Sequence, residues 1–382
     1  MNFELSDHHK SIRQLARDFA QGELRPRASE IDAKGEFIKD LIPKMAELGF
    51  MGLTIPEKYE GAGLDLMSAS LVIEEVAREC GSTALTLVAH NGLGMKHILR
   101  FGTEAQRQKY IPDLASGRKI AAWALTEPGS GSDASGLKTR AEVRSDGFVL
   151  NGSKAFITHA TVGDTYIVLA ATDPAKKQKG ISAFVIERGT PGFKPLKPED
   201  KLGCRGSDTA QIAIDQVKLS KDHLVGELNQ GFIDTLKILD QGRVIIASMS
   251  LGLGEAALRE SIRYAKEREQ FGKPIADFQA IQWKIANMAT ELAAARLMIM
   301  KAASMHDRGV PAIEESSMAK LFASEAASRA CTEAIQIHGG YGYIREYPVE
   351  RYWRDNRITE IGEGTSEVQR MIIAREILKK TS

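Results

Sequence analysis

The sequence predicts an α+β protein in which a helical domain, a β domain and a second helical domain follow one another along the chain. The chain of 382 residues exceeds the roughly 250–300 residues at which a single core stops growing, so two or three packed units are expected. Helical periodicity dominates both ends, and short β-rich runs occupy only the middle. This order differs from the strand–helix alternation of a doubly wound nucleotide-binding fold.

Residues 1–118 are expected to form an N-terminal α-helical domain. Helical stretches rich in Glu and Arg, such as residues 68–80, are separated by loops that Pro43, Pro56 and Gly61 mark. Strand signals are nearly absent, so this part predicts helices joined by short loops.

Residues 119–231 are expected to form a middle β domain with a sandwich or barrel-like sheet. Short β-rich runs bounded by Gly, Asp, Pro or Lys lie at 147–152, 165–172, 181–187 and 209–215. Such runs are typical of strands separated by turns, and together they predict a compact domain.

Residues 232–382 are expected to form a C-terminal four-helix bundle. Apolar residues recur there at steps of four and three and mark one buried stripe: Ile281, Ile285, Met288, Leu292, Ala295 and Ile299. Gly252–Ala257 fits the G-x-G-x-x-A pattern of dinucleotide-binding turns, but it lies in a helical run with no strand before it. Close helix packing is the preferred interpretation of these glycines.

The charge balance and the hydropathy exclude several classes of protein. With 51 basic residues, 50 acidic residues and a net charge of +1, no field favours nucleic acid or a membrane surface. The longest apolar stretches fall short of the ~20 residues that a membrane span needs, and the N-terminus lacks a signal-peptide core. We expect no membrane insertion and a bacterial-type cytoplasmic location, with the mitochondrial matrix as second choice.

The cysteines and histidines are expected to be structural. Cys80, Cys204 and Cys331 are far apart and form no C-x-x-C pair, so neither disulfides nor a metal site is expected. A reactive thiol at Cys204 is the alternative to a buried one. His90, His159 and His338 lie near the motifs described next, and packing or hydrogen bonding is expected of them rather than proton transfer.

Three stretches carry the chemical signal. Trp123–Asp133 is rich in Gly, Ser and Thr, whose N–H and hydroxyl groups suit a flavin edge or a phosphate; a polar turn is the alternative. Arg263–Pro274 ends a helix and includes Arg268, for which a solvated or paired charge is the alternative. Gln336–Gln369 contains Glu363 between two glycines, either an exposed turn or a carboxylate free to approach a substrate.

Together these stretches resemble the acyl-CoA dehydrogenase family over essentially the whole chain. The matching motifs are Leu-Thr-Glu-Pro-Gly-x-Gly-Ser-Asp at 125–133, Asn-Gly-Ser-Lys-x-Phe-Ile-Thr at 151–158, Lys-Leu-Gly-x-Arg-Gly-Ser at 201–207, Arg-x-Gln-Phe-Gly at 268–272, Gln-x-x-Gly-Gly-x-Gly at 336–342 and Glu-Gly-Thr-Ser-Glu at 363–367. The helix–β–helix order agrees with the family's architecture. The resemblance implies an FAD enzyme that converts an acyl-CoA thioester to its trans-2-enoyl-CoA.

The resemblance also implies which residues contact the cofactor. They are Leu125, Thr126, Ser132, Phe156, Ile157, Thr158, Arg268, Phe271, Gln279, Gln336, Gly339, Gly340, Thr365 and Glu367. The counterparts of Arg268, Phe271, Gln279, Gln336 and Gly340 reach the pyrophosphate and adenosine across a subunit boundary, in a homotetramer built as a dimer of dimers. A guanidinium at position 268 suits that task because it offers bidentate, always-charged donors.

By the same resemblance, Glu363 is the catalytic base that removes the α-proton, flavin N5 accepts the β-hydride, and an electron-transfer flavoprotein receives the electrons. The implied substrate contacts are Ser132, Asp240, Arg243 and Gly364. An apolar pocket is expected to raise the pKa of the Glu363 carboxyl toward neutrality.

Three positions depart from patterns found in many relatives. Some relatives carry the base at the position of Gly242, where glycine cannot act, and this favours Glu363. Phe156 stands where many relatives have Trp, and Gly362 stands where Tyr is frequent. The missing Tyr side chain makes room for a branched, cyclic or aromatic acyl group, with a linear acyl group in a shifted pocket as the alternative.

Two other functions remain as alternatives. An oxidase-like or monooxygenase-like enzyme would pass electrons from the same fold to O₂, but the chain length matches the dehydrogenases. A non-catalytic scaffold would keep the fold without the reaction, but the intact Glu363 argues against it.

Overall fold

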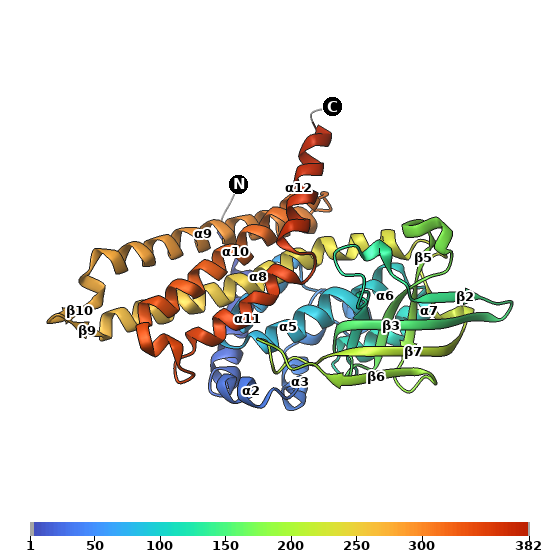
Figure 1. Cartoon of the computed structure of the whole chain (residues 1–382), viewed down its shortest axis with the longest axis horizontal. Helices are drawn as coiled ribbons and strands as arrows, with labels where there is room; N and C mark the ends of the chain where they lie inside the picture. The colour runs from blue at the N-terminus through green and yellow to red at the C-terminus, as the bar shows by residue number, and fades with distance from the viewer. Residues whose placement is uncertain (1–3, 381–382) are drawn as a thin grey trace.

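The computed structural model describes residues 4–380, and its helices and strands follow the expected order (Figure 1). The N-terminal helices are α1 Asp7–Phe19, α2 Ala28–Lys34, α3 Ile42–Glu47, α4 Leu66–Glu79, α5 Gly81–Ala89, α6 Met95–Phe101 and α7 Glu104–Ala115. Local capping explains where several begin: Asp65 accepts the Ser68 N–H at the start of α4, and Thr103 and Gln106 form a capping box on α7. The predicted helical character of this part is confirmed.

The middle part is one sheet that curls around its own core. Its strands are β1 Ala121–Ala124, β2 Arg140–Val143, β3 Gly147–Thr158, β4 Thr165–Ala171, β5 Ile181–Glu187, β6 Phe193–Pro198, β7 Thr209–Ser220 and β8 Leu224–Val225. They lie in the order β6-β7-β3-β2-β4-β5-β8, with β1 paired to β4. One face packs on α6 and α7, and the other encloses a core of strand residues around Phe148, Tyr166 and Phe184. This agrees with the barrel-like prediction.

The C-terminal part contains four packed helices and a fifth that stands away from them. The helices are α8 Gly231–Glu267, α9 Gln279–Asp307, α10 Ile313–His338, α11 Val349–Ile361 and α12 Ser366–Lys380, and a small hairpin of β9 Glu269–Gln270 and β10 Lys273–Pro274 joins α8 to α9. Helices α8 to α11 pack together, which confirms the predicted bundle, and α12 projects outward (Figure 1).

The glycine pattern in the middle of α8 serves helix packing, as expected from the sequence. A Cβ at Gly252 would lie 2.3 Å from the Glu74 carbonyl oxygen of α4, and one at Gly254 would lie 2.5 Å from Leu292 of α9. These close approaches bring the N-terminal helices and the bundle into one hydrophobic core.

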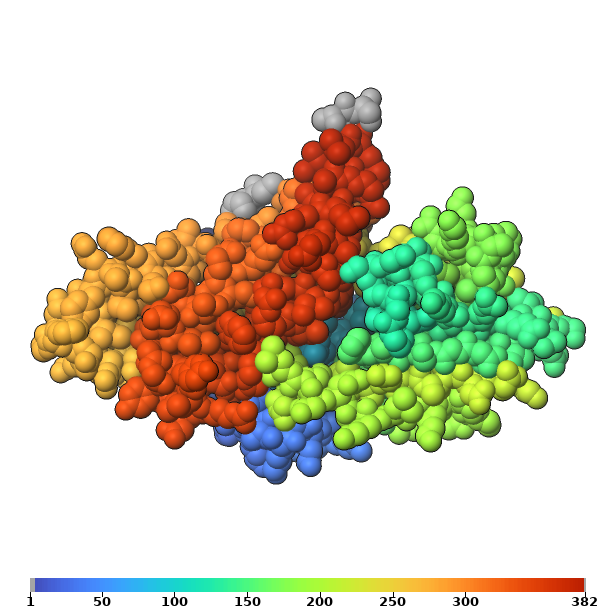
Figure 2. All heavy atoms as spheres, viewed as in Figure 1, coloured from blue at the N-terminus to red at the C-terminus, as the bar shows by residue number. Residues whose placement is uncertain are grey.

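A hollow on one face separates the C-terminal helices from the β domain. Figure 2 shows α11 and α12 in red on one side, the green β domain on the other, and blue-teal N-terminal helices at its floor. Within residues 4–380, no helix combines the length and the apolar character that crossing a bilayer requires.

Candidate active site

Glu363 lies in the short turn between α11 and α12, and its backbone is held in a strained conformation. Its φ angle is 54°, which lies in a region that residues other than glycine seldom adopt. Two buried donors hold this turn: Gln369 Nε2 donates to the carbonyls of Glu363 at 3.2 Å and Gly364 at 2.9 Å, and Lys320 Nζ donates to the Gly364 carbonyl at 2.7 Å. The turn therefore presents Glu363 in one defined orientation.

The Glu363 carboxylate points at Gly242 in the middle of α8. A Cβ at Gly242 would lie only 2.1 Å from Glu363 Oε2, so the missing side chain is what makes room for the carboxylate. Both carboxylate oxygens are shut off from solvent, and neither has a hydrogen-bond partner in the described part of the chain. Burial raises the pKa of the Glu363 carboxyl to about 7, although the charges of Lys320 and Arg243 lower it.

Asp240 and Arg243, the two substrate residues predicted on α8, lie within one helical turn of Gly242. Arg243 is 5% exposed, and its guanidinium lies 3.7 Å from Asp240 Oδ1. Asp240 Oδ2 lies 3.9 Å from His306 Nε2, and burial raises the pKa of the Asp240 carboxyl. Of the two, Arg243 is the residue whose charge acts on the Glu363 carboxyl.

The loop after β1 is fastened to β3 by buried polar contacts. Lys154 Nζ donates to the Leu125 carbonyl at 3.0 Å and to Glu127 Oε1 at 2.8 Å, with both charged side chains nearly inaccessible. The Ala155 N–H donates to the carbonyl of Thr126 at 2.9 Å. These bonds fix the first two sequence motifs relative to each other.

Phe156 presents its ring to open space at an irregularity in β3. The register of β3 against β7 shifts between Lys154 and Ile157, and Phe156 has a φ of 56° with 67% of the residue exposed. Ile157 beside it is buried, Thr158 is half-buried and Ser132 is exposed. A strained residue that offers an uncovered aromatic ring, next to accessible hydroxyls, fits the planar ring of a flavin.

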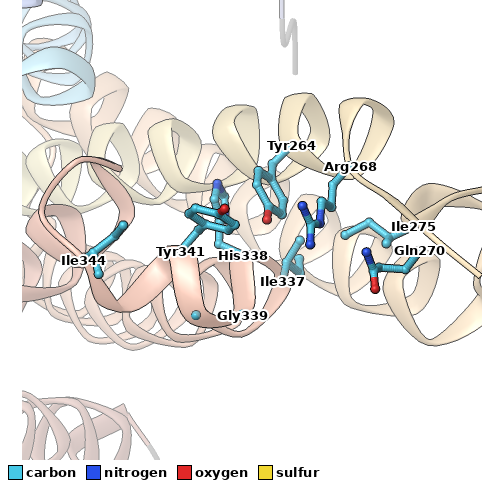
Figure 3. Close-up of a pocket in the computed structure, with 10 residues that line it drawn as sticks. Tyr264, Arg268, Gln270, Ile275, Ile337, His338, Gly339, Tyr341 and Ile344 are labelled. Carbon is cyan, nitrogen blue, oxygen red and sulfur yellow. The ribbon is translucent and has the colours of Figure 1, made fainter.

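A second group of predicted cofactor residues surrounds a pocket of about 450 Å³ at the far end of the bundle. Figure 3 shows Arg268, Tyr341, His338 and Gly339 around it, and Gly340 also contributes to its lining. The exposed guanidinium and the glycine backbone fit a phosphate group.

His338 has a packing role in this pocket wall. Its ring stacks on Tyr264 with a centroid distance of 4.3 Å, and Nδ1 bonds to the Ala334 carbonyl at 2.7 Å. His90 and His159 are also buried and bonded to backbone groups. Cys204 is buried too, and its burial raises the pKa of its thiol. All four side chains are thus buried, in agreement with the packing and hydrogen-bonding roles expected for them.

The remaining predicted cofactor residues are not gathered into one site by a single chain. Phe271 is 93% exposed at the tip of the β9–β10 hairpin, and Gln279 and Gln336 are exposed outside the lining of the pocket. That hairpin and the β sheet lie at opposite ends of the molecule (Figure 1). Near Glu363, Thr365 accepts the Val368 N–H at 3.3 Å. Glu367 is exposed at the start of α12.

Sequence reasoning missed the buried groups that hold the site in place: Glu127, Lys154, Lys320 and Gln369. One signal was available, because Lys320 occupies a position of α10 spaced three and four residues from the buried Ala323 and Ser316. A lysine on a buried stripe indicates a specific partner.

Three family models match consecutive parts of the chain. They are described as acyl-CoA dehydrogenase N-terminal domain, middle domain and C-terminal domain, and they match residues 6–118, 122–217 and 229–378.

Similar proteins cover nearly the whole chain. The probable acyl-CoA dehydrogenase YngJ of Bacillus subtilis is 48% identical over 99% of this chain and 100% of its own length. CarC, a subunit of the caffeyl-CoA reductase-Etf complex of Acetobacterium woodii, is 47% identical over 98% of this chain and 99% of its own. The structure of butyryl-CoA dehydrogenase from Megasphaera elsdenii matches with a TM-score of 0.97 and 44% identity, over 99% of this chain and 100% of that one.

Proposed function

The chain belongs to the acyl-CoA dehydrogenase family, FAD-dependent oxidoreductases acting on acyl-CoA, and we propose that Glu363 is the base of its reaction. In that reaction an acyl-CoA thioester loses two hydrogens and becomes the trans-2-enoyl-CoA. Glu363 takes the α-proton, and the β-hydrogen leaves with its electron pair.

The observation that carries this proposal is the state of the Glu363 carboxylate. It is buried and unbonded within the described chain, and burial raises its pKa to about 7. A general base works best when its pKa lies near the operating pH. The charges of Lys320 and Arg243 keep the carboxylate ionisable in spite of its burial.

The residues that would hold FAD form two sets. The loop at Leu125 and Thr126, with Ser132 and residues 156–158, would bind the flavin ring, and Arg268 with Gly339 and Gly340 would bind the phosphates. Thr365 and Glu367 would contact the cofactor beside Glu363. When bound, FAD supplies the acceptor for the hydride from the substrate β-carbon.

We propose that the substrate thioester lies against the Glu363–Gly364 turn, with Asp240, Arg243 and Ser132 along the acyl-CoA. The Glu363 N–H would donate to the thioester oxygen and stabilise the charge that develops when the α-proton leaves.

The separation of the two sets supports a shared cofactor site. Because the hairpin that carries Phe271 lies at the opposite end of the molecule from the sheet (Figure 1), two subunits would together enclose one FAD. We therefore propose a homotetramer arranged as a dimer of dimers. The residues that reach the cofactor of a neighbouring subunit would be Arg268, Phe271, Gln279, Gln336 and Gly340. Sedimentation of the holoenzyme tests the assembly.

The proposed electron acceptor is an electron-transfer flavoprotein, which the similarity to a subunit of an Etf complex supports. The second candidate is O₂, as in an oxidase. Peroxide formation during turnover in air distinguishes them. We place the enzyme in a bacterial-type cytoplasm.

The acyl group is proposed to be larger near its α-carbon than a linear chain. Gly362 ends α11 beside Glu363, and the nearest atom to a Cβ placed there is the Ile358 carbonyl oxygen at 3.3 Å. The similarity to a caffeyl-CoA reductase subunit supports an aromatic group. If no branched, cyclic or aromatic thioester is turned over, this enlargement is refuted.

The decisive experiment is anaerobic mixing of the purified flavoprotein with a panel of acyl-CoA thioesters while the flavin absorbance is followed. Substrates are expected to bleach the flavin, and Glu363→Gln is expected to slow bleaching by about 10²–10⁴-fold. Glu142→Gln, an exposed change on β2, is the matched control and should bleach at the normal rate. Undiminished bleaching by Glu363→Gln would show that another group is the base.

A further inference from the structure

A narrow, mostly apolar cavity lies beside the proposed base and contains a lysine. Its walls come from the turn after residue 52, helix α4, the segment that leads into α6, and α8. The lining residues are Leu53, Thr54, Leu66, Ala69, Ile73, Asn91, Gly92, Lys96, Gln241, Gly242 and Ile245. Because Gly242 lies against the Glu363 carboxylate, this cavity continues from the place where the α-carbon would lie.

Lys96 is the one cationic residue in this lining. Its ammonium donates a hydrogen bond of 2.7 Å to Thr54 Oγ1, which belongs to the same cavity. Within residues 4–380 this neutral hydroxyl is its only hydrogen-bond acceptor, and no carboxylate lies within ion-pair distance. The other lysines buried near the site are bound differently: Lys154 pairs with Glu127, and Lys320 binds a backbone carbonyl.

The charged groups around Lys96 do not neutralise it. Burial lowers the pKa of the Lys96 ammonium to about 8, with Arg100 lowering it further and Asp307 raising it. The Asp307 carboxylate is already used, because it accepts the Leu66 N–H at 2.7 Å and the N–H of the next residue. At neutral pH Lys96 therefore keeps its positive charge beside an apolar cavity without a negative partner.

A poorly hydrated cation without a partner is costly, and a bound anion offsets that cost. We propose that Lys96 and Thr54 bind a carboxylate carried by the acyl chain, so that the enzyme takes dicarboxylyl-CoA thioesters. The ammonium and the hydroxyl supply two donors from one side, and the apolar walls enclose the methylene groups between thioester and carboxylate. This inference rests on the proposed function and concerns the distal end of the acyl chain, whereas the space at Gly362 lies beside its α-carbon.

A dicarboxylyl chain fits this cavity only if side chains in its walls move. It now has room for about 20 Å³, roughly one water molecule. Gln241 and Lys96, two long unbranched side chains, fill part of the space, and Gln241 makes no side-chain hydrogen bond within the described chain. Gly92 and Gly242 add no side chains, so a carboxylate can replace Thr54 as the partner of the ammonium once these residues rotate.

The test compares thioesters of equal carbon number with and without the terminal carboxylate: glutaryl-CoA with valeryl-CoA, and adipyl-CoA with hexanoyl-CoA. In the holoenzyme kcat/KM is expected to favour one dicarboxylyl member by at least about tenfold. Lys96→Met is expected to lower that ratio by about 10- to 100-fold, and Lys96→Arg should preserve most of it. Lys218→Met, an exposed change on β7, is the control and should leave the ratio unchanged.

Binding provides a second readout that does not need turnover. Calorimetry on the Glu363→Gln holoenzyme should give a lower Kd for the preferred dicarboxylyl-CoA than for its matched monocarboxylyl-CoA, and adding Lys96→Met should remove the difference. If Lys96→Met fails to retain FAD, Lys96→Gln replaces it. The inference is overturned if the Lys96 variants leave these ratios unchanged, or if the enzyme prefers the monocarboxylyl members. This holds even if valeryl-CoA bleaches the flavin. If no thioester bleaches the flavin, the proposed reaction fails, and the Kd ratio still tests Lys96.

Discussion

Glu127 and Glu363 are both carboxylates removed from solvent, but their surroundings are opposite. Glu127 accepts hydrogen bonds from Lys154 Nζ at 2.8 Å and from the backbone N–H groups of Lys138 at 2.6 Å and Thr139 at 2.9 Å. The Glu363 oxygens accept no hydrogen bond from the described residues. The charges of Lys320 and Arg243 act on this carboxyl without a hydrogen bond. One carboxylate holds the loop after β1 in place, and the other is left with unused bonding capacity.

The two carboxyl groups accordingly differ in acidity. Burial alone would raise the pKa of Glu127, but its bonds to Lys154 and the backbone lower it below its ordinary value. The same burial raises the pKa of Glu363 to about 7, because no hydrogen bond opposes it. Bonding therefore decides which of the two buried acids has a lowered pKa and which has a pKa near neutrality.

The largest expected effect on stability is that of Glu127→Gln. The change leaves the Lys154 ammonium buried without a countercharge, which should lower the free energy of unfolding by about 3–5 kcal/mol. Denaturant unfolding followed by circular dichroism, with flavin release as a second signal, measures it.

Glu30→Gln is the matched control, because Glu30 forms an exposed ion pair with Lys34 on α2. It should leave the free energy of unfolding essentially unchanged, because an exposed ion pair contributes little to stability. The pKa of Glu127 is depressed in the folded protein, so its stabilisation is present above the unfolded pKa and is lost as the pH falls through the folded value. Equal costs for the two variants would remove the distinction between Glu127 and an ordinary surface acid.

Glu363→Gln is expected to change the free energy of unfolding in the opposite direction. The raised folded pKa means that ionised Glu363 costs stability, with no cost below the unfolded pKa and the full cost above about pH 7. Glu363→Gln should therefore be more stable than the natural chain at pH 8, on the order of 1–3 kcal/mol, and nearly equal to it at pH 4. Thermal unfolding of the holoenzymes across this pH range decides; a variant that is less stable at pH 8 contradicts the unbonded carboxylate.

Gly242→Ala tests whether Glu363, the proposed base, needs the space that the missing side chain of Gly242 leaves. The added Cβ meets the flexible end of Glu363, so the carboxylate is displaced while the helix remains intact. Because misplacing a reacting group by about 1 Å costs up to 10²-fold, flavin reduction should slow by about 10- to 100-fold with little change in melting temperature. Gly362→Ala is the neighbouring control, since its Cβ would meet a backbone oxygen rather than the carboxylate. Equal slowing by both would refute the contact.

The sequence predicted the helix–β–helix order and the bundle, because helical and strand periodicities are local properties that one chain displays directly. It also predicted a carboxyl of raised pKa at Glu363, on the ground of an apolar pocket. It did not predict Lys320 or Gln369, since nothing local shows that side chains from α10 and α12 meet the turn at Gly364. The cofactor roles of Phe271, Gln279 and Gln336 stay predictions, because one chain leaves these residues at its surface.

The smallest expected effect belongs to Lys320→Met, which alters the surroundings of Glu363 without touching its carboxylate. The Lys320 charge lowers the pKa of Glu363, so its removal should raise that pKa and move the acid limb of kcat/KM to higher pH. Arg243 still acts on the carboxylate. Glu360 and Glu367, which also act on Lys320, keep Arg357 and Arg370 as cationic neighbours. At pH 7 a smaller fraction of Glu363 would be ionised in the variant, so the rate should fall by about two- to fivefold. Toward pH 9 Glu363 is ionised in both proteins, so the rate should recover. Lys320→Arg keeps the charge and should keep the limb in place. If both variants shift it equally, Lys320 acts through its bond to the Gly364 carbonyl and not through its charge.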